Sequence, residues 1–189
     1  MIAQRAVEKL REQFNDVVHE VIEFREQLLV RIETSSIREV CQFLRDDEEL
    51  KFDMAIDVLG ADRLVPVDNP TMHGYVNDPF DRELRSKQEH IPADERFEVI
   101  YVLYSNMNNE YIRLKVRVAE EGQRVPSVVA VWKSADCAER EVYDMFGIEF
   151  EGHPDLRRIY MPEYFEHYPL RKDFPLMGIP GSLPLPDKQ

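Results

Sequence analysis

The distribution of proline restricts the fold of this chain more than any other feature. Seven of the twelve prolines in 189 residues lie after Gly152. Proline donates no backbone hydrogen bond and forces extended geometry on the residue before it, so this segment cannot be a helix or a central strand. It also keeps apolar and aromatic residues that a disordered tail would lack. We predict an extended tail over residues 153–189 that folds back on its own domain or lies on a partner.

Residues 1–152 show the periodicities of one small α+β domain. Three stretches have apolar residues at helical spacing, and they cover residues 3–14, 37–44 and 136–146. Ser36 with Glu39, and Asp136 with Glu139, have the spacing of capping boxes. Gly147 is suited to end the third helix. We therefore expect three helices, two of them starting at these caps, beside a sheet.

Six further segments are predicted as strands. The clearest pair is a hairpin in which residues 96–104 and 110–119 are joined by residues 105–109. Single strands are expected at residues 17–24, 28–32 and 128–132. A strand near residues 52–58 is expected to place Phe52, Met54, Ile56 and Val58 on one face. The fold class is thus α+β, with a small mixed, mainly antiparallel sheet, flanking helices and the long extended C-terminal tail.

Composition excludes several classes of function. The net charge of -13 argues against binding the phosphate backbone of nucleic acid and against docking on anionic lipid. No stretch approaches the roughly 18 apolar residues of a spanning helix, and the N-terminus lacks the apolar core of a signal peptide. Cys41 and Cys137 are the only cysteines, too few for an iron–sulfur cluster within the chain. A cytoplasmic, reduced protein is expected, with a loop insertion at about residues 66–94.

Acidic and histidine residues near the third helix offer no recognisable catalytic or metal motif. Glu139 and Glu141 diverge on a helix, and no nucleophile accompanies them or Asp144. His153 and His167 lack the converging ligands of a metal site, so His153 is expected to be a hydrogen-bonded turn residue. Arg140 lies four residues from both Asp136 and Asp144, which is the spacing of exposed ion pairs.

One long run of residues identifies a family. Residues 139–159, Glu-Arg-Glu-Val-Tyr-Asp-Met-Phe-Gly-Ile-Glu-Phe-Glu-Gly-His-Pro-Asp-Leu-Arg-Arg-Ile, and residues 169–176, Pro-Leu-Arg-Lys-Asp-Phe-Pro-Leu, resemble the signature of the C-type subunit of NADH–quinone oxidoreductase. This is the 30 kDa subunit family of respiratory complex I. The resemblance covers roughly residues 96–176. One departure is Glu166-His167-Tyr168, where the family usually has a glycine.

The resemblance implies an architectural role. Members bind no cofactor themselves, whereas the complex uses FMN, iron–sulfur clusters, NADH and quinone and couples electron transfer to proton translocation. The tail is expected to dock on the larger quinone-site subunit (49 kDa, or D), which places the chain at the cytoplasmic side of the bacterial membrane and in contact with it only through the complex. Within this frame Arg140 and Asp144 are expected in a buried or interface network. The residues implied at subunit interfaces are Glu139, Arg140, Asp144, Phe146, His153, Leu156, Arg157, Arg158, Tyr168, Leu170, Arg171, Lys172, Asp173 and Phe174.

Three alternative functions remain open from the sequence. The first is the equivalent subunit of a membrane-bound hydrogenase or of a related ferredoxin- or coenzyme-linked complex. The second is a stand-alone hydrolase that uses Glu139, Asp144 and His153. The third is a free adaptor whose tail folds only on binding.

Overall fold

The computed structural model describes residues 2–14, 16–25, 27–64, 95–120, 122 and 124–175. The insertion expected at about residues 66–94, and the tail beyond residue 175, lie outside the described residues.

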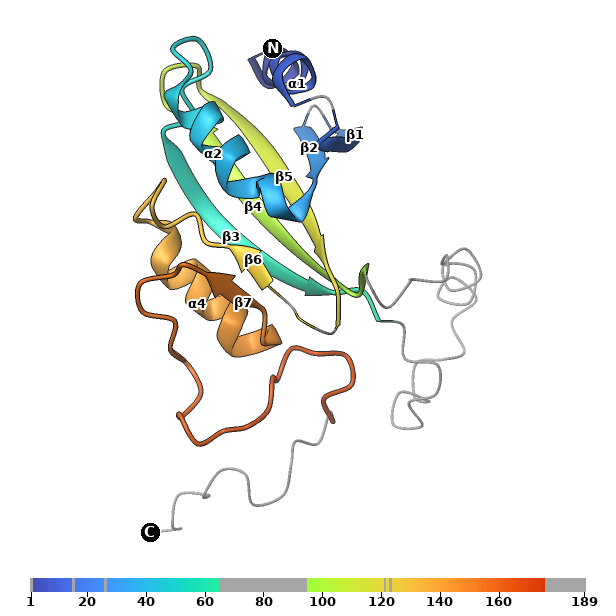
Figure 1. Ribbon diagram of the computed structural model, residues 1–189, viewed down its shortest axis with the longest axis vertical. Helices are drawn as coiled ribbons and strands as arrows, with labels where there is room; N and C mark the ends of the chain where they lie inside the picture. The colour runs from blue at the N-terminus through green and yellow to red at the C-terminus, as the bar shows by residue number, and fades with distance from the viewer. Residues whose placement is uncertain are drawn as a thin grey trace.

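A five-stranded sheet forms the centre of the described fold (Figure 1). Its strands are β1 (Val18–Phe24), β2 (Gln27–Ile32), β3 (Met54–Asp62), β4 (Phe97–Ser105) and β5 (Glu110–Val118). Their order is β1-β2-β5-β4-β3, with β2 and β5 parallel and the other neighbours antiparallel. A separate parallel pair joins β6 (Arg124–Pro126) to β7 (Glu149–Glu151). The predicted hairpin is confirmed as β4 and β5.

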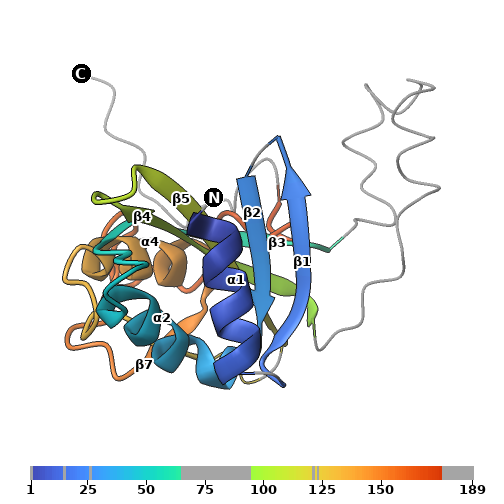
Figure 2. The same ribbon diagram turned by 90° about the horizontal axis from the view of Figure 1, so that it is seen from above.

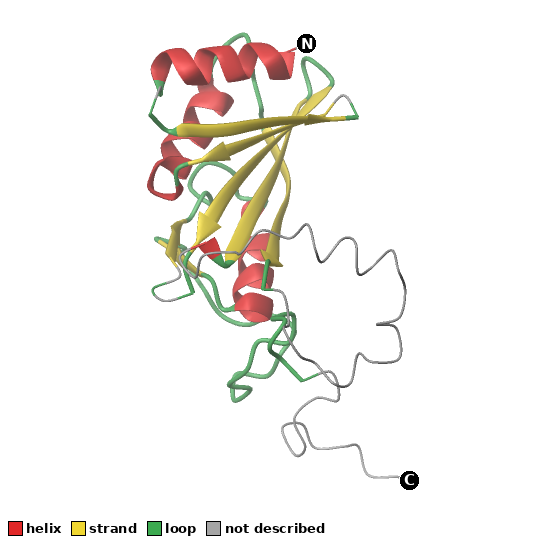
Figure 3. Ribbon diagram, turned by 90° about the vertical axis from the view of Figure 1, so that its right-hand side faces the viewer, coloured by secondary structure: helices red, strands yellow, loops and turns green. Residues whose placement is uncertain are grey.

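The described α-helices are α1 (Ile2–Gln13), α2 (Ile37–Asp46) and α4 (Ala135–Phe146), and a 3₁₀ turn, η1 (Thr34–Ser36), precedes α2. Helices α1 and α2 lie side by side on one side of the sheet (Figures 2 and 3). Helix α4 packs on the same side against β3, where an added Cβ on Gly60 would lie 2.5 Å from the Phe146 ring. Only glycine allows this approach without a shift of the ring. The α+β class predicted from the sequence is confirmed.

The core lies between these helices and the sheet. Alternate residues of β4 and β5 point into it, and the buried ones are Phe97, Val99, Tyr101, Leu103, Ile112, Leu114, Val116 and Val118. They pack with Val30 of β2, Leu10 of α1 and Leu44 of α2 in one apolar cluster. All described helices therefore cover one face of the sheet and leave the other face without a described helix.

The expected face of the strand near residues 52–58 is wrong. The register of β3 against β4 shifts between Ala55 and Asp57, as at a β-bulge. An extra residue in one strand turns the following side chains to the other face. Met54 and Ile56 alternate with the buried Ala55 and are 43% and 44% exposed, and the shift then returns Val58 to the core face that Ala55 occupies.

The expected strand at residues 128–132 and both expected capping boxes are also wrong. The amides of Val131 and Trp132 donate to the Val128 carbonyl, so this β-branched run forms a turn. Helices α2 and α4 begin after Ser36 and Ser134 without a side-chain capping bond. The helix end at Gly147 is confirmed, since Gly147 is left-handed with φ of 76° and its amide donates to the Tyr143 carbonyl.

Candidate functional site

The candidate site is the segment of residues 153–175, here called the strap. It follows β7 and turns back along α4, as the orange-red trace in Figure 1 shows. It contains no helix or strand, and its backbone therefore forms few regular hydrogen bonds. Side chains of the folded domain take their place at two points.

The first attachment point is the carboxylate of Asp144, near the end of α4. This side chain is fully buried. It accepts hydrogen bonds from the backbone amides of Ile159 (3.1 Å), Tyr160 (2.7 Å) and Met161 (2.9 Å), and Arg158 Nη1 lies 2.7 Å from its Oδ1. Burial raises the pKa of Asp144, but the Met161 and Tyr160 amides and the Arg158 guanidinium outweigh it, so the pKa lies below its usual value. Asp144 therefore holds the beginning of the strap as a charged group.

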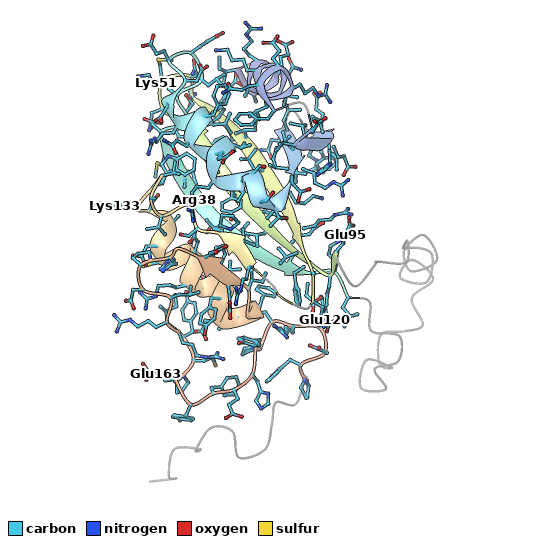
Figure 4. All side chains as sticks on the ribbon, in the orientation of Figure 1. Arg38, Lys51, Glu95, Glu120, Lys133 and Glu163 are labelled. Carbon is cyan, nitrogen blue, oxygen red and sulfur yellow. The ribbon has the colours of Figure 1, made fainter. Side chains whose placement is uncertain are left out.

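The second attachment point joins the far end of the strap to the ends of β3 and β4. Arg96 is buried and donates from Nε and Nη2 to the two carboxylate oxygens of Asp62 at 3.2 and 2.8 Å. The same Nη2 lies 3.0 Å from Asp173, and the Lys172 amide donates to Asp62 Oδ2 at 2.8 Å. Glu120, labelled in Figure 4 at the end of β5, also pairs with Arg96. The pKa of Arg96 is raised by these carboxylates, with Asp62 first, so the group stays charged.

Arg171 fills the space between the two attachment points. Its Nε donates to the carbonyl of Phe146 at 2.6 Å. Its guanidinium lies 4.4 Å from the ring centre of Tyr168 and 5.2 Å from that of Phe97, which are cation–π distances. A Cβ at Gly147 would come within 2.6 Å of both Arg171 and Tyr168. Glycine is thus required there by its left-handed backbone and by the close passage of the strap.

The strap buries one set of apolar residues and exposes another. Phe165 is 4% exposed and stacks near Phe174, while Leu156 and Met161 pack against the main core. Arg158 lies 5.0 Å from the Tyr168 ring centre and 5.9 Å from that of Phe165. The outward residues are Ile159 (36% exposed), Tyr160 (61%), Tyr164 (63%) and Leu170 (53%). The strap therefore exposes several apolar side chains, interspersed with charged ones such as Arg157 and Glu163.

Glu139 precedes Asp144 on α4 but faces the domain interior. Its carboxylate accepts from Ser127 Oγ at 2.6 Å and from the Val128 amide at 2.7 Å, and it is fully buried. Burial raises its pKa to about 7, which these two donors and the more distant Arg38 only partly offset. Arg38, labelled in Figure 4, donates to the carbonyls of Ser127 and Glu151. Together these contacts fix the turn between β6 and α4.

The remaining predicted site residues have local partners. The expected Arg140–Asp144 pairing is not what forms, because Asp144 binds Arg158, while Arg140 Nε donates to the Arg157 carbonyl at 3.1 Å. The Asp136–Arg140 pair is loose at 4.0 Å. The His153 side chain is buried and accepts the Asp155 amide at Nδ1 (3.0 Å), which confirms His153 as a hydrogen-bonded turn residue.

Two central residues of the site, Asp62 and Arg96, were not predicted. They are separated along the chain by the insertion, and only the pairing of β3 with β4 brings them together. Ser127 was also missed as a partner of Glu139, because residues 128–132 were expected to continue as a strand. No local spacing signals any of these contacts.

The contacts of the site bind the strap to its own domain. Among the residues that the structure describes, no three His, Cys, Asp or Glu side chains gather as a metal site would require. No helix within the described ranges is long and apolar enough to cross a membrane. The fold and the strap together define a small α+β protein whose extended C-terminal segment is held on its own domain by buried ionic contacts.

The comparison with protein families agrees with the signature residues. Residues 30–180 match the model of the family described as respiratory-chain NADH dehydrogenase, 30 Kd subunit. The chain belongs to this family. Relatives of the C type from NADH-quinone oxidoreductase include one from Geobacter metallireducens, 39% identical over 95% of this chain and 93% of the relative. Another, from Coxiella burnetii, is 37% identical over 93% of this chain and 79% of the relative.

Solved structures share the fold. A trypsin-resistant fragment of Nqo5 has a TM-score of 0.59 and 28% identity, and the match covers 82% of this chain and all of the fragment. A chain of the archaeal membrane-bound sulfane sulfur reductase has a TM-score of 0.57 at 22% identity, over 92% of this chain and 86% of that chain. The second similarity shows the fold alone.

Proposed function

We propose that this chain is a non-catalytic structural subunit in the peripheral arm of a bacterial NADH–quinone oxidoreductase, and that the strap is its principal docking element. The observation that carries the proposal is the double attachment of the strap. Two buried ionic sites, at Asp144 and at Arg96, hold an extended segment that leaves several large apolar side chains exposed. A segment that is already ordered loses less conformational entropy when a partner covers it.

The partner follows from the family. We propose that the strap contacts the larger quinone-site subunit, of the 49 kDa or D type, and that FMN, iron–sulfur clusters, NADH and quinone are bound by other subunits. The chain would then lie at the cytoplasmic side of the membrane, attached only through the complex. Several residues expected at the interface, among them Arg158 and Asp173, instead contact their own domain. We propose that Arg158 and Asp173 hold the strap in its conformation, while Tyr160, Tyr164 and Leu170 contact the partner.

The test replaces the outward residues without touching either attachment point. A chain with Tyr160→Ala, Tyr164→Ala and Leu170→Ala should fold normally, because these side chains are more than half exposed. It should enter the membrane complex at a level reduced at least about tenfold, since each lost aromatic or aliphatic contact at an interface costs on the order of 1 kcal/mol or more. Incorporation is measured by quantitative mass spectrometry of native membranes.

A matched control is Met107→Ala, which removes a side chain that is 59% exposed at the β4–β5 turn, away from the strap. It should leave incorporation unchanged. Membranes with the triple variant should lose NADH–quinone activity in proportion to the complex lost, and each assembled complex should turn over normally. Full assembly with slower turnover would instead place the strap on the electron or quinone path. Co-purification of the chain with hydrogenase-type subunits would assign it to a hydrogenase-type complex in place of NADH–quinone oxidoreductase.

A further inference from the structure

The second face of the five-stranded sheet carries apolar residues that no described helix covers. Helices α1, α2 and α4 all pack on the opposite face, so this outer face is the side of the sheet turned away from α1 and α2 in Figure 3. Exposed apolar side chains occur on it in β1, β3 and β5: Ile22 (40%), Phe24 (68%), Met54 (43%), Ile56 (44%), Leu59 (45%) and Tyr111 (47%). Soluble monomers rarely expose contiguous apolar patches of this kind without a partner.

The strand register makes these residues one continuous band. Ile22 pairs with Leu29, Leu29 with Arg113, and Arg113 with Val102. In the next row Tyr111 pairs with Tyr104, and Tyr104 with Met54, and the two tyrosine rings lie 4.6 Å apart. The band, here called the outer band, therefore crosses all five strands. In β3 the first row ends at Asp57, which pairs with Val102 and follows the exposed Ile56 at the bulge.

A single cation stands in the middle of the outer band. Arg113 donates to the side-chain oxygen of Gln27, a neutral group, and among the described residues it forms no salt bridge. This hydrogen bond holds the guanidinium in the row of Leu29 and Val102, next to the row of Tyr111 and Tyr104. A cation that is held by an amide and bordered by Leu29, Val102 and Tyr111 can form a charge-assisted hydrogen bond with the carboxylate of a partner.

The charged residues further along the same face show the contrast. Lys115 lies 3.4 Å from Glu98, and Arg31 lies 3.4 Å from Glu95 (labelled in Figure 4). Each of these cations already has a carboxylate within the chain, so this part of the face is internally neutralised. Arg113 is different because its partner is an amide.

We propose that the outer band is a second docking surface, which takes an acidic amphipathic helix from another subunit. A helix is favoured over a strand because the backbone groups of β2, β5 and β4 are already paired within the sheet. A segment that covers a sheet face must satisfy its own backbone hydrogen bonds, as a helix does. The inference goes beyond the strap and depends on the proposed function only in requiring that the chain be part of an assembly.

The test is photo-crosslinking in the complete assembly. A photoreactive phenylalanine analogue replaces Leu59 or Tyr111 in the full chain, and in a parallel sample it replaces Tyr164 on the strap. The complex is irradiated in native membranes, and crosslinked peptides are sequenced. Leu59 and Tyr111 should each crosslink to a helical segment of another subunit that has several Asp or Glu residues. Crosslinks only within this chain, crosslinks to a segment without acidic residues, or no adduct at either position would overturn the proposal.

A charge reversal supplies the second measurement. In membranes that are not irradiated, less of the subunit identified by crosslinking should stay bound to the Arg113→Glu chain after a salt wash. The loss should be about tenfold or more, because the substitution places like charges opposite each other across the interface. Arg11→Glu, an exposed reversal on α1, is the matched control and should have no such effect. Unchanged retention with Arg113→Glu would overturn the role of Arg113. An adduct at Tyr164 without adducts at the outer band would refute the second docking surface and leave the proposed role of the strap intact. Adducts at the outer band without one at Tyr164 would refute the strap as the docking element and leave the second surface intact.

Discussion

Helix α4 carries two fully buried carboxylates, and their surroundings shift the two pKa values in opposite directions. Glu139 faces the turn between β6 and α4 and receives two hydrogen bonds, from a hydroxyl and an amide, and its pKa rises to about 7. Asp144 faces the strap and receives three amides and one guanidinium, and its pKa falls below the usual value. A short stretch of one helix separates the two environments.

The difference shows that burial alone does not set the charge of a carboxylate. Desolvation is the largest influence on both groups, and it acts in the same direction on both. The number of donors, and the presence of a cation within hydrogen-bonding distance, decide the net result. Inside the domain, the pKa of Glu139 is therefore raised to about 7. The strap depends on Asp144 as a permanent anion.

The largest effect is expected when the anion of the strap is removed. Asp144→Asn replaces the carboxylate by an amide of the same shape and leaves Arg158, whose side chain is 10% exposed, without its counter-charge. Loss of one partner of a buried ion pair costs about 3–5 kcal/mol. The free energy of unfolding, measured in urea, should fall by that amount. Asp136→Asn on the same helix, where the carboxylate is 40% exposed, should change it by less than about 1 kcal/mol.

A double-mutant cycle sharpens this first prediction. In a chain with Arg158→Leu, the additional change Asp144→Asn should cost less than in the natural chain, by about 1–3 kcal/mol. Equal costs in both backgrounds would mean that the three backbone amides, rather than the guanidinium, account for the effect.

The pH dependence of the stability that Asp144 contributes follows from its lowered pKa. The contribution of Asp144 is present above its usual pKa of 3.8 and is lost as the pH falls through the folded value.

The second prediction concerns Glu139 and has the opposite sign with pH. Its raised pKa gives a contribution to stability that is complete below about pH 4.5 and is lost as the pH rises through about 7. Glu139→Gln cannot ionise and can keep both contacts, with its amide oxygen accepting from the Val128 N–H and its NH2 group donating to Ser127 Oγ. Relative to this variant, the natural chain should lose about 2–3 kcal/mol of unfolding free energy between pH 5 and pH 8, at about 1.4 kcal/mol per pKa unit.

Urea titrations of both chains at several pH values measure that difference. Ser127→Ala serves as the control, because it removes one donor to the carboxylate and should move the decline in stability to higher pH. A variant Glu139→Gln that is less stable by the same amount at pH 5 and pH 8 would mean that Glu139 is ionised throughout, and that the comparison with Asp144 fails.

Periodicity in the sequence was sufficient for most of the fold. The hairpin of β4 and β5 and the end of α4 at Gly147 are local features, and both were predicted correctly. The errors arose where the local signal agreed with more than one structure. The β-branched residues 128–132 resemble a strand but form a turn, because Glu139 and the Val128 carbonyl take up the amides that a ladder would have used. The bulge in β3 likewise leaves no mark on the alternation around Ile56.

The candidate site was predictable only in part. Asp144, Arg158 and Arg171 were named because they match a family signature, and spacing alone did not show what they contact. Their partners lie at sequence separations that depend on the path of the strap, such as the 14 residues between Asp144 and Arg158. Asp62 and Arg96 have no neighbouring signal, since strand pairing alone joins them. Contacts of this kind are properties of the tertiary fold.

The smallest effect is expected at Arg157, which tests how the strap divides its residues between its own domain and a partner. Its side chain is 65% exposed and pairs with the exposed Asp155 at 2.9 Å. Exposed pairs contribute about 0–1 kcal/mol, so Arg157→Ala should barely change the unfolding free energy of the free chain. Arg5→Ala, which removes exposed pairs with Glu8 on α1 and with Glu49, is the control and should change the unfolding free energy equally little. If Arg157 meets a partner's carboxylate, only Arg157→Ala will reduce incorporation into the complex, by the equivalent of about 2–5 kcal/mol for a buried pair and far less at the rim. Equal incorporation of both variants would leave the apolar side chains as the part of the strap that a partner recognises.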